Sequence, residues 1–252
     1  MSINKNCVAL IPARSGSQRI TDKNIKKLNG HPLIAYSIAA AKESKIFNDI
    51  VCITDSPVYA DIAKHYGAST PESLRPESLS GSLSPDIEWV SWILAELNKN
   101  KKYPEVFSIL RPTSPFRSAK TICHGYKAFM GDLAADSLRA IELTSQHPGK
   151  MWTVRNNRML PLMPFEIDGV AWHSSQYANL PEIFIQNASL EFAYTKIVTD
   201  LGSISGECIL PFFTKGLEGF DINTPEDWML AEAYINSNQV KLPEIQCAPY
   251  NN

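Results

Sequence analysis

The chain lacks the sequence features of several large protein classes. Its five cysteines are scattered, an odd total without a C-x-x-C pair, which argues against structural zinc and against a disulfide framework. The histidines form no H-x-x-x-H or H-E-x-x-H pattern, so the sequence offers no catalytic zinc site. The G-x-S-x-G motif of serine hydrolases is also missing. None of these chemistries is therefore expected here.

Neither positive nor negative charge is in large excess. The 252 residues carry 24 basic and 26 acidic side chains, a formal net charge of −2, so no basic surface for nucleic acid is expected. The residues before Pro12 and Arg14 hold too few apolar side chains for a signal peptide or a membrane span. We therefore expect a cytoplasmic protein that binds neither nucleic acid nor membrane.

Two kinds of segment alternate along most of the chain. Apolar runs typical of buried strands occupy residues 7–11, 49–54, 105–110, 136–143 and the stretch "GECILPFF". Amphipathic or capped segments predict helices over residues 31–45, 56–67, 84–100, 118–131 and 223–236. Strand and helix in turn, with short connections, predict an α/β protein whose mostly parallel sheet is covered by helices on both faces.

The alternation stops between about residues 144 and 195. Aromatics and prolines occur there without a clean period, over a length that is unusual for a loop within a compact domain. We expect a single domain over 1–252 with an insertion at about 144–195. The insertion would be either an arm buried against a second protomer or an irregular excursion packed on its own domain; its apolar residues are Met151, Trp152, Leu160, Leu162, Met163, Phe165 and Trp172.

The stretch "ALIPARSGSQRITDKN" (9–24) follows the first expected strand, where ligands of open α/β sheets bind. Gly16 and its neighbouring serines would let backbone N–H groups converge on an anion. Arg14, Arg19 and Lys23 add three positive charges. Neither a Walker motif nor G-x-G-x-x-G is present. The chemistry favours a phosphate loop over a solvated basic turn and leaves both open.

Three further stretches could carry polar chemistry. In "FDINTPEDW" (220–228), Asp221 and Asn223 could hold Mg²⁺ together with substrate phosphates, or could be turn residues before a helix cap. The stretch "LRPTSPFR" (110–117) offers hydroxyls and guanidinium groups to a ligand with a carboxylate, or is a rigid turn. The stretch "LRPESLSGSLSP" (74–85) is by itself only a loop.

Together these stretches resemble the acylneuraminate cytidylyltransferase family, which makes CMP-activated sialic-acid-like sugars. The resemblance covers most of the chain and rests on six collinear motifs: "IPARSGSQRITDKN", "PLIAYSI", "ITDS", "LRPESLS", "LRPTSPFR" and "FDINTPEDW". In that family the anomeric hydroxyl of a nonulosonic acid attacks the α-phosphorus of CTP, and pyrophosphate leaves. The resemblance implies a three-layer, Rossmann-like nucleotide-diphospho-sugar transferase fold, Mg²⁺ dependence, and a homodimer whose arm closes over the neighbour's sugar site.

Carried over by position, the resemblance assigns catalysis to Arg14 and Lys23, which would grip the triphosphate and the leaving pyrophosphate, and to Asp221, which would hold the metal with Asn223. The nucleotide pocket that it implies consists of Ala13, Arg14, Ser15, Gly16, Ser17, Gln18, Arg19, Lys23, Asn24, Arg75 and Ser82. The sugar subsite that it implies consists of Arg111, Thr113, Ser114 and Arg117.

The chain departs from the family pattern at three positions. Gln18 stands where many members have lysine, and Arg19 could replace the lost charge. Asn223 stands where a second metal-binding aspartate is usual. Arg111 stands where sialic-acid members commonly have glutamine, and the arginines that those enzymes supply from the partner's arm are not evident in "SSQYANLPEIFIQNAS". Arg111 could therefore hold the sugar carboxylate.

The leading hypothesis is an enzyme that transfers CMP from CTP to a nonulosonic acid of the legionaminic or pseudaminic type. An alternative of the same class is cytidylyl transfer to Kdo or an amino-Kdo. An alternative of a different class is a nucleotide-binding paralogue without transfer activity, which the departures at Gln18 and Asn223 keep open.

Overall fold

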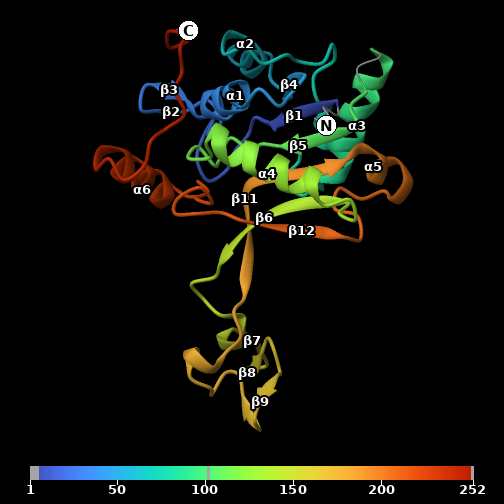
Figure 1. Cartoon of the computed structure of the whole chain (residues 1–252). Helices are drawn as coiled ribbons and strands as arrows, with labels where there is room; N and C mark the ends of the chain where they lie inside the picture. The colour runs from blue at the N-terminus through green and yellow to red at the C-terminus, as the bar shows by residue number, and fades with distance from the viewer. Residues whose placement is uncertain (1–5, 101–102, 251–252) are drawn as a thin grey trace. The chain divides into compact units, whose positions relative to one another are not determined.

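A computed structural model describes residues 6–100 and 103–250 of the chain (Figure 1). The chain divides into two compact units, unit 1 within residues 1–140 and 187–252 and unit 2 formed by residues 141–186. Among the described residues, no helix combines the length and apolar character needed to cross a membrane.

Unit 1 alternates strands and helices as expected. Its strands are β1 (Cys7–Pro12), β2 (Lys27–Leu28), β3 (His31–Pro32), β4 (Asp49–Ile53), β5 (Val106–Ile109), β6 (Ser137–Leu143), β11 (Phe184–Tyr194) and β12 (Ile209–Phe213), the ends of β6 and β11 running into unit 2. Its α-helices are α1 (Leu33–Ser44), α2 (Pro57–His65), α3 (Asp86–Lys99), α4 (Ala119–Gly131), α5 (Thr195–Leu201) and α6 (Pro225–Asn236). A 3₁₀ turn spans Glu77–Leu79.

The central sheet has six strands in the order β12-β6-β11-β5-β1-β4. Strand β1 pairs in parallel with β4 on one side and β5 on the other, whereas β11 runs antiparallel to β5. The predicted α/β fold with a mostly parallel sheet is therefore confirmed, and the antiparallel strand β11 makes the sheet a mixed one. Strand β11 was not expected, because its sequence FIQNASLEFAY mixes apolar and polar residues without a clean alternation and lies within the stretch assigned to the insertion.

Helices cover both faces of the sheet, as the side chains of β1 show. Cys7, Ala9 and Ile11 pack into a core with α1, α2 and α4. Val8 and Leu10 point the other way, into a core formed with α3 and α5. This alternation buries both faces of β1, which explains its continuous apolar sequence.

The helix starts follow the capping chemistry of the sequence. Ser56, Ser118 and Thr224 each accept a hydrogen bond from a backbone N–H in the first turn of α2, α4 and α6. The caps of α4 and α6 are reciprocal, through Thr121 and Asp227 respectively. Such caps satisfy N–H groups that a helix leaves unpaired, and they explain why these starts are readable from sequence.

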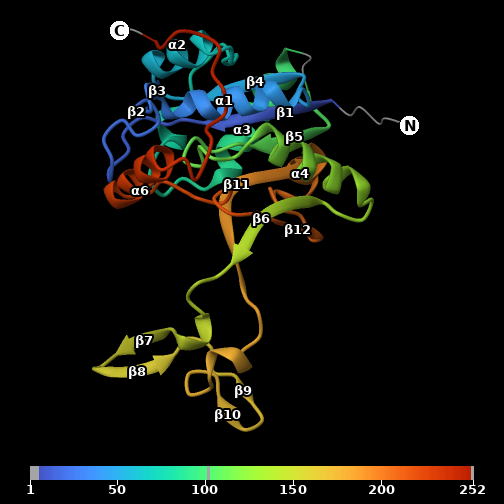
Figure 2. The ribbon, with the colours of Figure 1, turned by 60° about the vertical axis from the view of Figure 1, so that its left-hand side comes forward.

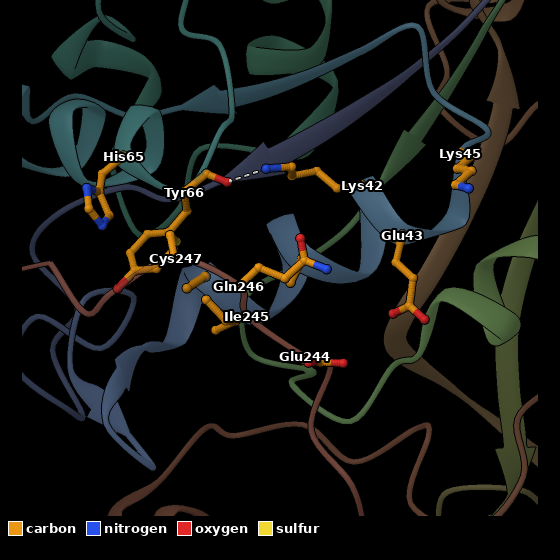
Figure 3. Close-up of a pocket in the computed structure, with 11 residues that line it drawn as sticks. Lys42, Glu43, Lys45, His65, Tyr66, Glu244, Ile245, Gln246 and Cys247 are labelled. Atoms are coloured by element: carbon orange, nitrogen blue, oxygen red, sulfur yellow. Dashed lines mark hydrogen bonds between the residues drawn. The ribbon is translucent and has the colours of Figure 1, made fainter.

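The C-terminal tail runs along α1 and α2. Tyr250 N donates to Tyr66 Oη at 3.0 Å, and His65 Nε2 lies 2.8 Å from Ala248 O. Beneath the tail, a cavity of about 530 Å³ carries charges of both signs, and Figure 3 shows its labelled walls. None of its lining residues belongs to the predicted nucleotide or sugar sites.

Unit 2 contains two short antiparallel hairpins, which Figure 2 shows from a second direction. Its elements are β7 (Trp152–Arg155), β8 (Arg158–Pro161), β9 (Glu166–Ile167), β10 (Val170–Ala171) and two 3₁₀ turns, Pro148–Lys150 and Tyr177–Asn179. Both hairpins have two-residue turns with positive φ, Asn156–Asn157 and Asp168–Gly169. Asn-Asn and Asp-Gly favour this geometry, so the sequence did contain the turns that the expectation of an irregular stretch missed.

The packing of α4 on β11 can be tested at a glycine. A Cβ on Gly125 would come within 2.4 Å of Leu190 Cδ2, and Leu190 is fully buried. We expect Gly125→Ala to lower the free energy of unfolding by about 1–3 kcal/mol through overpacking. Gly131→Ala at the end of the same helix meets nothing within 4 Å and is the matched control. Urea denaturation of both variants measures the difference; equal stabilities would contradict the close contact.

Candidate active site

A cavity of about 280 Å³ lies at the carboxyl ends of β1 and β5, entirely within unit 1. The chain passes from β1 to β4 on one side and then crosses to β5 on the other. The point between β1 and β5 is therefore where the strand order reverses, the usual ligand position in open α/β sheets. Residues that follow β1 and β5, such as Arg14 and Arg111, line this cavity.

The loop after β1 is fixed by contacts to its neighbours. Ala13 N donates to Ile53 O at 2.9 Å, which extends the pairing with β4. Ser15 donates to the Asp55 carboxylate through its backbone N at 2.7 Å and its Oγ at 2.8 Å. Asp55 therefore shapes the turn at Gly16, whose φ of +71° suits glycine. Farther along the loop, Tyr59 Oη donates to Asp22 Oδ1 at 2.9 Å.

Three cationic side chains line the part of the cavity that the sequence predicts to bind the nucleotide. Arg14 NH1 donates to Ser80 O at 3.2 Å, and Lys23 Nζ donates to Ile222 O at 2.8 Å. Arg75 is buried, and its Nε donates to Leu79 O at 2.9 Å. Burial lowers the pKa of Lys23 and of Arg75, while nearby carboxylates oppose this effect. Desolvated cations of this kind attract a polyanion such as a triphosphate.

Asp221 lies beside this cationic group. The next residue links it to the cavity wall, because Ile222 N donates to Thr113 O at 2.8 Å. Asp221 Oδ2 accepts from Asn223 Nδ2 at 2.5 Å, whereas Asp221 Oδ1 is buried and has no hydrogen-bond partner within the described part of the chain. A buried carboxylate oxygen without a donor is costly unless a cation meets it. Asp221 therefore fits a metal ligand.

The described residues of this site do not form a metal site from protein side chains alone. Among residues 6–100 and 103–250, no group of three or more His, Cys, Asp or Glu side chains could hold a metal ion. Mg²⁺ commonly binds through one or two carboxylates plus substrate phosphates and water, whereas zinc needs several protein ligands. Asp221 beside a cavity lined by cationic side chains thus suits Mg²⁺ that is also bound by substrate phosphates.

Arg111 and Arg117, both assigned to the sugar subsite, differ in position. Arg111 lines the cavity and pairs with Asp86 Oδ2 at 2.5 Å and with Glu191 Oε1 at 3.0 Å. Arg117 is fully buried and donates to Ser189 O at 2.5 Å and Ser37 Oγ at 2.6 Å. Burial lowers the pKa of Arg117 to about 9, so it stays cationic near neutral pH. Arg117 therefore supports the backbone under the subsite from within the core.

The cavity brings together eight of the residues singled out in the sequence: Arg14, Ser17, Lys23, Asn24, Arg75, Ser82, Arg111 and Thr113. The others do not line it. Ala13, Ser114 and Arg117 are buried, Gly16, Gln18 and Arg19 are exposed, and Ser15, Asp221 and Asn223 are half-buried beside it.

Sequence reasoning missed six lining residues: Pro12, Gly81, Ser84, Asp86, Trp89 and Pro112. Asp86 is the most consequential of them. It lies in the first turn of α3, where it accepts hydrogen bonds from Arg111 and from Trp89 Nε1. Burial alone would raise the pKa of Asp86, but the charge and hydrogen bond of Arg111 outweigh it and lower the pKa. The apolar periodicity of this segment predicts its helix but gives no indication of the partner of Asp86.

A basic cavity at the strand-order reversal of an α/β sheet, with one unpartnered carboxylate oxygen beside it, is typical of a site for a polyanionic ligand such as a nucleotide. A family model described as Cytidylyltransferase matches residues 8–82. The CMP-N,N'-diacetyllegionaminic acid synthase of Legionella pneumophila is 33% identical over 238 residues, covering 93% of this chain and 98% of that protein. The chain therefore belongs to the cytidylyltransferase family.

Two other curated relatives match about half of the chain. The N-acylneuraminate cytidylyltransferase of Escherichia coli is 38% identical over 122 residues, 48% of this chain and 28% of that protein. The pseudaminic acid cytidylyltransferase of Campylobacter jejuni is 33% identical over 123 residues, 49% of this chain and 53% of that protein. The three relatives are named for different nonulosonic acids.

Solved structures support the fold. The structure of CMP:2-keto-3-deoxy-manno-octonic acid synthetase complexed with CTP superposes with a TM-score of 0.66 at 14% identity, covering 92% of this chain and 99% of that one. A 4-diphosphocytidyl-2C-methyl-D-erythritol synthase from Anaerococcus prevotii gives a TM-score of 0.62 at 13% identity, with 92% and 99% coverage. At these identities the likeness concerns the fold alone.

Proposed function

We propose that the protein transfers CMP from CTP to the anomeric hydroxyl of a nonulosonic acid and releases pyrophosphate. The observation that carries this proposal is the relative from Legionella pneumophila, which aligns over 93% of the chain at 33% identity and is named for such a synthase. The basic cavity at the carboxyl ends of β1 and β5 offers the triphosphate site that this reaction needs.

In this proposal Arg14 and Lys23 bind the triphosphate and neutralise the charge that develops on pyrophosphate as it leaves. Asn24 supports them, because its Nδ2 donates to Arg14 O at 3.0 Å and fixes the backbone from which Arg14 extends. Arg75 and Ser82 face the nucleotide from the opposite loop. Phosphoryl chemistry depends mainly on alignment and charge neutralisation, so groups fixed before the substrate arrives are the catalytic contribution.

Asp221 is the proposed ligand of Mg²⁺, with Asn223 next to it. When bound, the ion neutralises phosphate charge and lowers the pKa of a hydroxyl that it contacts. The orphaned Oδ1 of Asp221 supports this assignment. The side-chain amide of Asn223 already donates to Asp221, so turning its oxygen toward a cation would require the amide to flip.

A legionaminic- or pseudaminic-type sugar is the proposed acceptor, bound through Arg111 and Thr113 on the other side of the cavity. Two of the three relatives cited are named for sugars of this type. A carboxylate on the acceptor would meet the guanidinium group of Arg111, for which arginine geometry is well suited.

A homodimer assembled through unit 2 is also part of the proposal. Unit 2 exposes many large apolar side chains for its size: Met151, Trp152, Val154, Met159, Leu160, Leu162, Phe165, Val170, Tyr177, Phe184 and Ile185. Exposed apolar surface of this kind commonly marks an interface with another protein. A cytoplasmic location fits five unpaired cysteines, one of them exposed, because a reducing compartment keeps thiols free.

The acceptor is tested by a panel of keto-sugar acids with CTP and Mg²⁺, following pyrophosphate release. We expect turnover with legionaminic- or pseudaminic-type acids and a kcat/KM for N-acetylneuraminate and Kdo that is lower by about tenfold or more, because a polar site rejects a mismatched substituent strongly. Preference for Kdo or an amino-Kdo would instead establish the alternative acceptor. No product from any sugar with folded protein would refute the proposed reaction.

Calorimetry with CTP and Mg²⁺ alongside this assay separates the enzyme from a nucleotide-binding paralogue. CTP binding together with turnover is expected. CTP binding without turnover on the whole panel would support the paralogue, in which Asn223 in place of an aspartate would be the first position to examine.

A further inference from the structure

Arg111 is held by two carboxylates, and one of them lies outside the cavity. The NH2 nitrogen of Arg111 donates to Asp86 Oδ2 at 2.5 Å and to Glu191 Oε1 at 3.0 Å. Asp86 lines the cavity beside Arg111, whereas Glu191 is 4% exposed on the central strand β11. Glu191 therefore contacts Arg111 from beneath, where substrate does not reach.

Glu191 bridges two arginines. Its second oxygen, Oε2, pairs with Arg139 NH1 on β6. Arg139 is also buried, and its NH2 donates to Ser205 Oγ at 2.8 Å. Asp86, Arg111, Glu191 and Arg139 thus form a chain of two negative and two positive charges. The two arginines allow Glu191 to be buried, because a charged carboxylate in the core is tolerated only when it is paired.

The backbone of Arg111 is fixed as well. Its carbonyl accepts from Ser37 Oγ at 3.1 Å and from both terminal nitrogens of Arg117 at 3.4 Å. In the side chain, the two carboxylates engage one nitrogen, NH2, and within the described residues no hydrogen bond engages Nε or NH1. A guanidinium group is planar and rigid, so fixing one nitrogen sets the direction of its other donors.

We propose that Glu191 is a positioning residue for acceptor recognition, which holds the guanidinium group of Arg111 so that its remaining N–H donors meet the carboxylate of the keto-sugar acid. Arg139 supplies the counter-charge that allows Glu191 to act in the core. The inference rests on the proposed function, because it takes the acceptor to be a sugar acid. A donor that is already ordered binds without the entropic cost of fixing a long side chain.

The test is Glu191→Gln, assayed with the acceptor that the wild-type enzyme uses best. The amide keeps the shape of the side chain, but it is neutral and has one oxygen, so it cannot pair with both Arg111 and Arg139. We expect the KM for the acceptor to rise about tenfold or more, while the KM for CTP stays within about threefold. General damage to the fold would affect both substrates, so the split between the two KM values is the diagnostic result.

A double-mutant cycle then asks whether Glu191 acts through Arg111. Arg111→Gln should raise the acceptor KM to a similar extent, and adding Glu191→Gln should raise it no further, because residues that act as one unit are not additive. Additive effects of the two changes would overturn the proposal.

Two further variants keep the test decisive. If Glu191→Gln alone does not fold, the combination of Arg139→Gln with Glu191→Gln removes the buried pair without leaving an unpaired charge, and the same acceptor-specific KM increase is expected. Glu218→Gln is the control, since Glu218 bonds Thr121 Oγ1 at 2.6 Å outside the cavity.

The outcomes distinguish this inference from the proposed function. An active wild-type enzyme whose Glu191→Gln variant keeps its acceptor KM, or raises both KM values equally, overturns the positioning role and leaves the function intact. A wild-type enzyme that uses no sugar acid refutes the function, and the positioning role falls with it.

Discussion

Asp221→Ala is expected to lower kcat by about a hundredfold or more, because removing one preorganised group that stabilises transition-state charge typically costs about 2.7–4 kcal/mol. The buried Oδ1 of Asp221 has no donor within the described residues, and Lys23 Nζ bonds the adjacent carbonyl of Ile222 at 2.8 Å. Loss of the carboxylate would remove the proposed metal ligand while the triphosphate cations remain. CTP affinity, measured by calorimetry without Mg²⁺, should therefore change much less than kcat.

The Asp221→Asn variant separates the effect of the carboxylate's negative charge from the effect of its shape. The amide fills the same space, so a loss of kcat close to that of the alanine variant would assign the effect to the negative charge. Full activity in the asparagine variant would contradict a role that depends on the negative charge of Asp221.

The Asn223→Asp variant tests the same site by adding a carboxylate instead of removing one. A second carboxylate would replace the amide that now donates to Asp221 Oδ2 at 2.5 Å, and two like charges at that distance repel unless a cation lies between them. Half-saturation of the variant should therefore require less Mg²⁺ than that of the wild-type enzyme. An unchanged Mg²⁺ dependence would argue that residue 223 lies outside the metal site.

The parallel part of the fold was predictable because its determinants are local. The continuous apolar sequence of β1 and the caps at Ser56, Ser118 and Thr224 are each set by a few neighbouring residues. Strand β11 was not predictable in the same way. Its buried Glu191 pairs with Arg111 and Arg139, which are distant in sequence. Period-based reasoning does not detect such tertiary pairing.

The same difference between local and distant contacts applies to the candidate site. Arg14, Lys23 and Asn24 lie within eleven consecutive residues, so their proximity follows from the sequence, and all three line the cavity. The contact of Asp55 with Ser15 joins two strand ends, and the Asp86–Arg111 pair joins α3 to the end of β5. These pairings depend on strand order, which one sequence does not display. The residues that support the site through such contacts could therefore be identified only from the structure.

Arg14→Ala is expected to lower kcat/KM for CTP by well over tenfold, with about a hundredfold as the central expectation, since a charge contact to a transferring phosphate is worth a few kcal/mol. Arg14 lines the cavity, and its NH1 donates to Ser80 O at 3.2 Å, so the side chain is already directed across the nucleotide site. Arg14→Lys keeps the charge but loses the planar fork, and it should fall between alanine and wild type.

Charge alone could produce part of this effect, so the matched control is a lysine elsewhere in the same segment. Lys27 is exposed in β2 and does not line the cavity, and Lys27→Ala should leave kcat/KM for CTP within about twofold once salt screens its long-range field. Arg19→Ala then measures whether the exposed Arg19 contributes to phosphate binding. A loss as large as that of Arg14→Ala would mean that the loop rearranges around CTP to bring Arg19 inward. A small loss would leave Arg14 and Lys23 as the residues of this loop that bind the triphosphate.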